Sequence, residues 1–227
     1  MKMLFMVMLF SFFAGTVFAE KALTLTDYFL MIPDGYFSAV EYSEDYDLQD
    51  NLEGGAKWGG EDLIDDIVVD AKNGFMKVVS KPDETLSFTA YLCYFVKADK
   101  TKVFGFALNA TGYCYDATTN AFITFDADGG ISDITALAMP PIDFKTFWGD
   151  APLPDKKYQF YHLVYTLPQA GTTWQVSIEE NQSPDCDYDV KLWEEYYKVM
   201  KKVKYKKVDI EWDKAHGIFN IGKKYTK

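Results

Sequence analysis

The most informative absence from this 227-residue chain is arginine, which occurs at no position. Arginine is the side chain that holds carboxylates and phosphates through two parallel hydrogen bonds, so this mode of anion recognition is excluded. All 23 basic residues are lysines, and 34 acidic residues outnumber them, which gives a formal net charge of −11. Nucleic-acid binding requires a basic surface that neutralises phosphates. The composition therefore argues against a nucleic-acid partner.

Histidine and cysteine are also scarce, with two and three residues. A zinc site needs three or four close ligands, which two distant histidines and three scattered cysteines do not supply. No Gly-x-Ser-x-Gly motif is present to support nucleophilic catalysis. The odd number of cysteines leaves at least one unpaired in a monomer. A disulfide between Cys93 and Cys114 and a pair of buried free thiols both fit the sequence, and Cys186 lies in an acidic turn.

Long apolar runs are missing, except near the start of the chain. Lys2 precedes an apolar run over residues 4–13, and small residues lead up to Ala19. This is the layout of a secretory signal peptide, and the run is shorter than the roughly 20 residues of a membrane span. We predict that residues 1–19 are removed between Ala19 and Glu20. The mature chain is then exported to the periplasm or the exterior, with no membrane span after cleavage.

Residues 20–227 are enough for one domain with its own core. A stretch rich in proline and aspartate, residues 149–157, is the best candidate for a loop between two lobes. The sequence therefore predicts a single α+β domain over 20–227, with a division into two lobes near 149–157 as the alternative.

The stretch 86–125 is the strongest signal of secondary structure in the chain. Over residues 86–96, apolar and aromatic side chains alternate, with Leu86, Phe88 and Ala90 on one face and Ser87 and Thr89 on the other. A polar linker follows, and then a second apolar run from residue 103. Alternation interrupted by a short polar segment is typical of a β-hairpin.

Helices are expected near both ends of the mature chain. Thr24 or Thr26 can cap a short helix that ends before Pro33. Residues 190–203 repeat apolar and aromatic side chains at helical spacing behind Asp189, a natural N-cap. We predict an α+β fold in which an antiparallel, meandering sheet packs against a short N-terminal helix and this C-terminal amphipathic helix.

Two further hairpins are predicted from their turns. An aspartate precedes a glycine by four residues at Asp70–Gly74 and again at Asp213–Gly217. Glycine accepts the left-handed backbone that a tight turn requires. An internal duplication and two independent hairpins with the same turn chemistry are both consistent with this repeat.

Three short motifs carry a family resemblance. They are residues 31–37 (MIPDGYF), 73–76 (NGFM) and 167–173 (LPQAGTT). In this order they resemble an uncharacterised family of secreted proteins from Bacteroides-type bacteria, whose members are similar to the β-lactamase-inhibitor type of α+β fold. The resemblance covers about residues 23–179 and leaves the final helix and hairpin unmatched. It implies no activity and no functional residues.

Aromatic residues make up 17% of the chain. Two interpretations fit this content: the rings fill a thick α+β core, or they exceed what the core can hide and some lie at the surface. Tyrosine and tryptophan are favoured where a protein holds a partner or a sugar ring. We therefore predict a non-catalytic binding protein of the envelope or exterior that recognises a protein or a glycan, with Trp58, Trp148 and Trp174 as candidate contacts. No catalytic residue is nominated.

The alternative function is a carboxylate-dependent hydrolase assisted by calcium. Asp126, Asp128 and Asp133 bring three carboxylates near a glycine-rich turn, and calcium prefers such oxygen ligands. The turn lacks the glycine and the closing glutamate of an EF-hand. Two carboxylates across a cleft would be needed for glycosidase chemistry, and the sequence singles out no pair.

Overall fold

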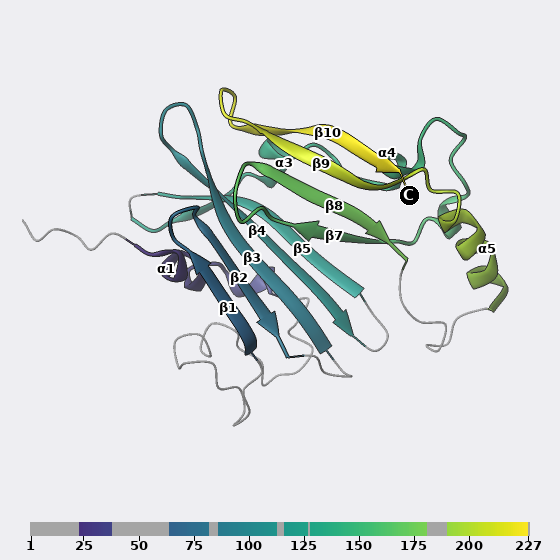
Figure 1. Ribbon diagram of the computed structural model, residues 1–227, viewed down its shortest axis with the longest axis horizontal. Helices are drawn as coiled ribbons and strands as arrows, with labels where there is room; N and C mark the ends of the chain where they lie inside the picture. The colour runs from purple at the N-terminus through teal and green to yellow at the C-terminus, as the bar shows by residue number, and fades with distance from the viewer. Residues whose placement is uncertain are drawn as a thin grey trace, which may run out of the picture.

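The computed structural model describes residues 23–37, 64–81, 86–112, 116–126, 128–180 and 190–226. The predicted signal peptide and its cleavage site lie outside these residues. Two antiparallel sheets form most of the described chain, and short helices lie around them (Figure 1). The predicted α+β class, dominated by antiparallel sheet, is confirmed.

The first sheet is a meander in which each strand pairs with the next along the chain. Its central hairpin joins eleven-residue strands, and eleven residue pairs are in register between them. The predicted hairpin is therefore confirmed. The six strands are β1 (Ile64–Asp70), β2 (Phe75–Ser80), β3 (Leu86–Val96), β4 (Lys102–Gly112), β5 (Asp116–Phe125) and β6 (Ile131–Asp133).

The second sheet has the strand order β10-β9-β8-β7. Its strands are β7 (His162–Thr166), β8 (Thr173–Glu179), β9 (Tyr205–Asp213) and β10 (Ile218–Thr226). Along the chain, the segment that connects the last strand of the first sheet to the first strand of the second forms α3 (Thr135–Ala138), α4 (Phe144–Trp148) and the 3-10 turn η2 (Lys156–Tyr158). The stretch 149–157 thus lies between the sheets in chain order, although one apolar core takes side chains from both sheets.

The first sheet is buried on both of its faces. One face is covered by α1 (Leu25–Leu30) and the turn η1 (Asp34–Tyr36), through which Phe29, Ile32 and Phe37 reach the strands. As predicted, Thr24 caps α1: its hydroxyl accepts from the amide of Asp27 at 3.2 Å, and Asp27 accepts from the amide of Thr24 at 2.6 Å. This reciprocal capping fixes where the helix begins.

The opposite face of the first sheet packs on the second sheet around Trp174 of β8, which is fully buried. The ring of Phe122 lies 4.5 Å from the Trp174 ring, and that of Phe95 lies 6.1 Å away. Gly105 of β4 leaves the space that the indole occupies, because a Cβ there would collide with the Trp174 ring. The close approach of the two sheets therefore depends on a residue without a side chain.

The two hairpins predicted from their turns share one geometry. Asp70 pairs with Phe75 and Asp213 pairs with Ile218 across turns of equal length. Gly74 and Gly217 have φ angles of 66° and 69°, in the left-handed region that favours glycine. In each turn the aspartate accepts hydrogen bonds from backbone amides of the turn residues. The repeated spacing thus records the same turn chemistry.

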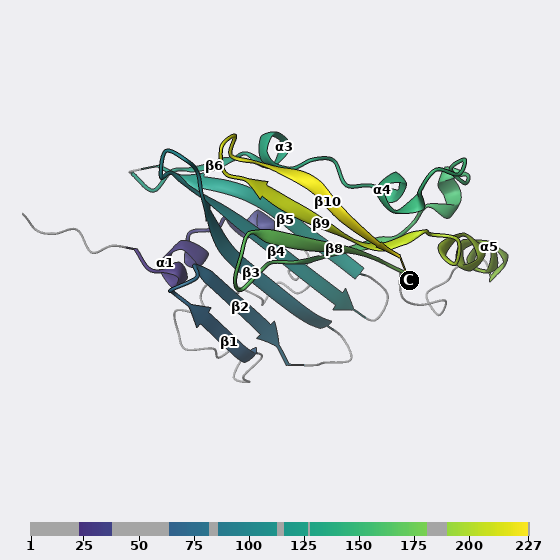
Figure 2. The same cartoon turned by 45° about the horizontal axis from the view of Figure 1, so that its top comes forward.

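Helix α5 (Val190–Met200) is three residues shorter than predicted, and it lies at the end of the second sheet (Figures 1 and 2). Its Tyr196 ring stacks on Phe160 at 4.1 Å, and Trp193 meets the same ring edge-on at 5.3 Å. Residues 156–161, which include η2, come before β7 in the chain, and β7 begins at His162.

A polar groove beside strand β7

The face of the first sheet that meets the second sheet changes character along its strands. Near Trp174 it is apolar, with Cys93, Val103 and Phe122 buried. Farther along β3, β4 and β5, the same alternate positions carry polar side chains. Strand pairing sets six of them in two neighbouring rows, Ser87, Thr111 and Asp116 in one and Thr89, Asn109 and Thr118 in the next.

Strand β7 lies against this polar region with an edge that pairs with no other strand of the described residues. Asn109 substitutes for a neighbouring strand: its side-chain amide donates to the Tyr165 carbonyl at 2.8 Å and accepts from the Tyr165 amide at 3.0 Å. The hydroxyl of Thr118 donates to the Leu163 carbonyl at 2.7 Å. Backbone groups on this edge are thereby satisfied without water, and the edge is closed to further strand pairing.

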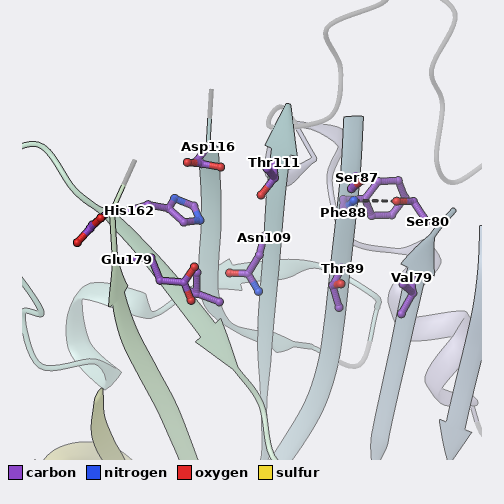
Figure 3. Close-up of a pocket in the computed structure, with 12 residues that line it drawn as sticks. Val79, Ser80, Ser87, Phe88, Thr89, Asn109, Thr111, Asp116, His162 and Glu179 are labelled. Carbon is purple, nitrogen blue, oxygen red and sulfur yellow. Dashed lines mark hydrogen bonds between the residues drawn. The ribbon is translucent and has the colours of Figure 1, made fainter. Parts of the chain in front are cut away.

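A groove of about 320 Å³ runs beside β7, open to solvent (Figure 3). The first sheet forms one side with the ends of β2 to β5, and β7 and β8 form the other. Ser80 closes one end, where its hydroxyl accepts from the amide of Phe88 at 2.8 Å. The lining residues are Val79, Ser80, Ser87, Phe88, Thr89, Asn109, Thr111, Asp116, His162, Val164, Glu179 and Glu180.

His162 is the one titratable base in the lining, and it is 7% exposed. Its ring points between the carboxylates of Asp116 and Glu179 in Figure 3, and the Thr118 hydroxyl lies 3.3 Å from Nε2. Burial lowers the pKa of His162 below its usual 6.5, although both carboxylates pull the pKa upward. The imidazole is therefore neutral near pH 7, and it offers one donor and one acceptor.

The groove presents hydroxyl, amide, imidazole and carboxylate groups, so it can both donate and accept hydrogen bonds. With His162 neutral, its charged lining groups are Asp116, Glu179 and Glu180. An anionic ligand would be repelled, whereas neutral and positively charged polar ligands fit this lining.

Of the tryptophans predicted to contact a partner, the two that the structure describes lie in the core. Trp174 is fully buried between the sheets. Trp148 is 8% exposed, stacks on Phe144, and donates its indole N–H to the Pro152 carbonyl at 3.0 Å. Neither ring is presented to a partner in this structure, because both are used in packing. Trp58 lies outside the described residues.

The three aspartates predicted to bind calcium lie in or near β6, where the carboxylates of Asp126 and Asp133 accept hydrogen bonds from the chain itself. Asp126 accepts from the amides of Asp128 and Gly130, at 3.0 and 2.6 Å. Asp133 accepts from the Tyr36 hydroxyl at 2.7 Å. Burial first, and then this hydrogen bond, raises the pKa of Tyr36 to about 12. Within the described residues, no three histidine, cysteine or acidic side chains are grouped so as to hold a metal ion.

Cys93 is buried and free, so the disulfide to Cys114 that the sequence left open is not formed. Burial raises the pKa of the Cys93 thiol well above its usual value. The thiol is therefore protonated and packs as a small apolar group. Cys114 and Cys186 lie outside the described residues.

Comparison of the chain with family models, with curated proteins and with solved structures gives no match. The resemblance to a secreted family with a β-lactamase-inhibitor-like fold therefore stays a prediction. Among the helices that the structure describes, none has both the length and the apolar character that a bilayer crossing requires.

The groove was not predicted, yet part of its signal is in the sequence. On the face of the central hairpin that carries Ser87 and Thr89, the pattern changes from polar to apolar at Tyr91, a change that marks where the covering sheet begins. The contribution of β7 could not be found this way, because His162 meets Asp116 only through the packing of one sheet on the other.

Proposed function

We propose that this protein is an exported, non-catalytic binding protein of the cell envelope or exterior, and that it holds a neutral or positively charged glycan in the groove beside β7. The proposal of export rests on the signal-peptide layout of residues 1–19. The proposal of a glycan rests on the groove. Trp148 and Trp174 have no part in it, because both are buried.

The observation that carries the proposal is the lining of the groove. Two rows of hydroxyl, amide and carboxylate side chains lie on rigid neighbouring strands, beside a wall formed by His162 and Glu179. Glycans present hydroxyl groups that both donate and accept, and fixed polar groups of both kinds match them. The carboxylates favour a glycan that is uncharged or that bears amino groups.

Binding of neutral oligosaccharides and of their amine-bearing, deacetylated forms to the mature chain tests this proposal by calorimetry. Replacing two groove carboxylates, Asp116→Asn with Glu179→Gln, should weaken binding about tenfold or more, because charge-assisted hydrogen bonds are lost. A matched control, Asp66→Asn with Glu194→Gln, removes the same charge from exposed sites on β1 and α5. The proposal fails if no oligosaccharide binds, or if both pairs of substitutions weaken binding equally.

One observation favours a second function, a carboxylate-dependent hydrolase. Asp116 on β5 and Glu179 on β8 come from different sheets and lie on either side of the His162 ring (Figure 3). Two carboxylates that flank a bound sugar are the minimum for glycoside hydrolysis. Prolonged incubation of the same oligosaccharides with the protein, followed by product analysis, distinguishes the two functions. If the oligosaccharides are cleaved, and Glu179→Gln abolishes the cleavage, the protein is a hydrolase and the proposal of a non-catalytic binding protein fails.

A further inference from the structure

Charge is distributed unevenly along the chain. Residues 198–227 contain ten lysines and three acidic residues, a net charge of +7, in a chain whose total is −11. The rest of the chain therefore carries −18. A local excess of one sign in a protein of the opposite sign creates a distinct electrostatic surface.

The structure gathers much of this positive charge at one end of β9 and of its partner β10, the edge strand of the second sheet. There Lys207 pairs with Tyr225, and Tyr205 pairs with Thr226. In Figure 1 the end of β10 lies at the edge of the sheet, near α5. The lysine–tyrosine edge is defined by six residues, Lys204, Tyr205, Lys207, Lys223, Lys224 and Tyr225.

Within the lysine–tyrosine edge, each tyrosine ring has two ammonium groups close to it. Lys204 and Lys224 lie 5.0 and 5.4 Å from the centre of the Tyr205 ring. Lys223 and Lys207 lie 4.7 and 5.3 Å from the centre of the Tyr225 ring. These distances are those of cation–π contacts, which hold the lysine side chains in place without cancelling their charge.

Three carboxylates lie near this edge, Asp150, Asp209 and Glu211, against its four lysines. Asp209 is 8% exposed and faces the sheet, where it accepts from the Tyr225 hydroxyl at 2.6 Å and from Gln175 at 3.3 Å. Lys204 forms an ion pair with the exposed Asp150 at 3.3 Å. Within the described part of the chain, Lys207 and Lys223 form no ion pair. An excess of positive charge therefore remains on the edge.

We propose that the lysine–tyrosine edge binds an anionic polysaccharide, an extended chain that bears carboxylate or sulfate groups. Lysine binds such groups as a point charge and does not need the planar geometry that arginine requires. Two of the lysines come from the start of β9 or the residue just before it and two from the end of its partner β10, so that four ammonium groups share one end of the sheet and can meet repeated charges on an extended chain. This surface lies apart from the groove and takes ligands of the opposite charge.

Two other polyanions fit the edge less well. Single-stranded nucleic acid binds through bases stacked on aromatic faces, and here ammonium groups lie over the tyrosine faces. A membrane surface is bound by a helix that buries a broad apolar face, whereas this site is the end of two strands dominated by lysine and tyrosine. Both polyanions serve as contrasting probes in the test.

The test measures binding of the full mature chain to a sulfated polysaccharide (heparin) and to a carboxylated one (polygalacturonate). Binding of at least one of the two is expected, and it should weaken as salt rises from about 50 to 200 mM. Substituting three edge lysines, Lys204→Gln, Lys207→Gln and Lys223→Gln, should weaken binding about tenfold. The matched control substitutes three exposed lysines elsewhere, Lys72→Gln, Lys81→Gln and Lys156→Gln, and should change binding less than about twofold.

Three results would overturn the proposal. The first is that neither polysaccharide binds. The second is that both triple variants lose the same affinity, which would mean that total charge, and not this edge, is responsible. The third is tighter binding of single-stranded DNA or of vesicles containing an anionic lipid than of either polysaccharide. Circular dichroism of both variants, which should match that of the parent, excludes loss of folding as the cause.

Discussion

The two ends of one sheet face differ in what covers them. At the apolar end the second sheet lies over the first, with Trp174 in the space that Gly105 leaves. At the polar end, Asn109 and Thr118 hold β7 against the strands by hydrogen bonds. The neighbouring row of polar side chains, Ser87, Thr111 and Asp116, lines the groove. Both ends belong to the same three strands, which continue through the boundary without a break in pairing.

This difference shows how one sheet supports a core and a candidate binding site together. Pairing between strands uses backbone groups, so it is indifferent to the side chains above it. The apolar end supplies the hydrophobic stabilisation that keeps the strands rigid. The polar end then holds Thr89, Thr111 and Asp116 in fixed positions without contributing to the core, a division of labour that favours precise binding.

The largest expected loss of stability comes from truncating the buried tryptophan at the apolar end. Trp174→Ala should lower the free energy of unfolding by about 3–5 kcal/mol, because it removes a fully buried indole and leaves a cavity. Denaturant unfolding followed by circular dichroism measures the loss. Trp174→Phe should lose less, since it keeps part of the apolar surface and removes an indole N–H that has no hydrogen-bond partner in the described structure. A change below about 1 kcal/mol for Trp174→Ala would contradict the burial.

The boundary between the two ends is tested next. Asn109→Ala should cost about 2–4 kcal/mol, because both backbone groups of Tyr165 lose their partner at a partly buried site. The same unfolding measurement applies. Thr111→Ala, two residues along the same strand, is the matched control and should cost less than about 1 kcal/mol. Equal losses from the two substitutions would mean that Asn109 does not hold β7.

A smaller effect is expected from the second contact at the boundary. Thr118→Val keeps the shape of the side chain but removes the hydroxyl that donates to the Leu163 carbonyl at 2.7 Å. The expected loss is about 1 kcal/mol, measured by denaturant unfolding. Thr118→Ser should retain most of the stability, because it keeps the donor. Equal losses from Val and Ser would show that the methyl group matters and the hydrogen bond does not.

The smallest effect is the pH dependence that His162 adds. Its pKa is lower in the folded protein than the usual 6.5, so the unfolded chain binds more protons as the pH falls below that value. The stabilisation is thus present above about pH 6.5 and decreases as the pH falls toward the folded-state pKa. The free energy of unfolding is measured for the parent and for His162→Gln at several pH values. Relative to the variant, the parent should become less stable as the pH falls through this window, because only the parent carries the histidine. A constant difference would contradict the shift.

Much of the fold could be predicted because its signals are local. Alternation over residues 86–96 and the glycine at Gly74 and Gly217 each reflect a conformation of a few consecutive residues. The arrangement into two sheets was not predicted, because nothing local distinguishes a strand of the first sheet from one of the second. The buried position of Trp174 depends on Gly105, which lies 69 residues earlier in the chain.

The candidate site was predicted less well than the fold. The aromatic surplus suggested exposed tryptophans, but aromatic rings in this protein fill two apolar clusters, one on each face of the first sheet. A composition gives the amount of aromatic surface and not its location. The structural roles of Asn109 and Thr118 were not predicted, since these roles come from contact with the edge of β7, more than 40 residues away in sequence.

The buried thiol of Cys93 has a consequence for how the chain must mature. Oxidants and other thiols attack the thiolate form, and in the folded protein this sulfur is both enclosed and protonated. Under the proposed export to an oxidising compartment, this protection begins only when the second sheet packs over the face that carries Cys93. Folding then competes with oxidation, and labelling of Cys93 by an alkylating reagent during refolding should stop when the two sheets have packed together.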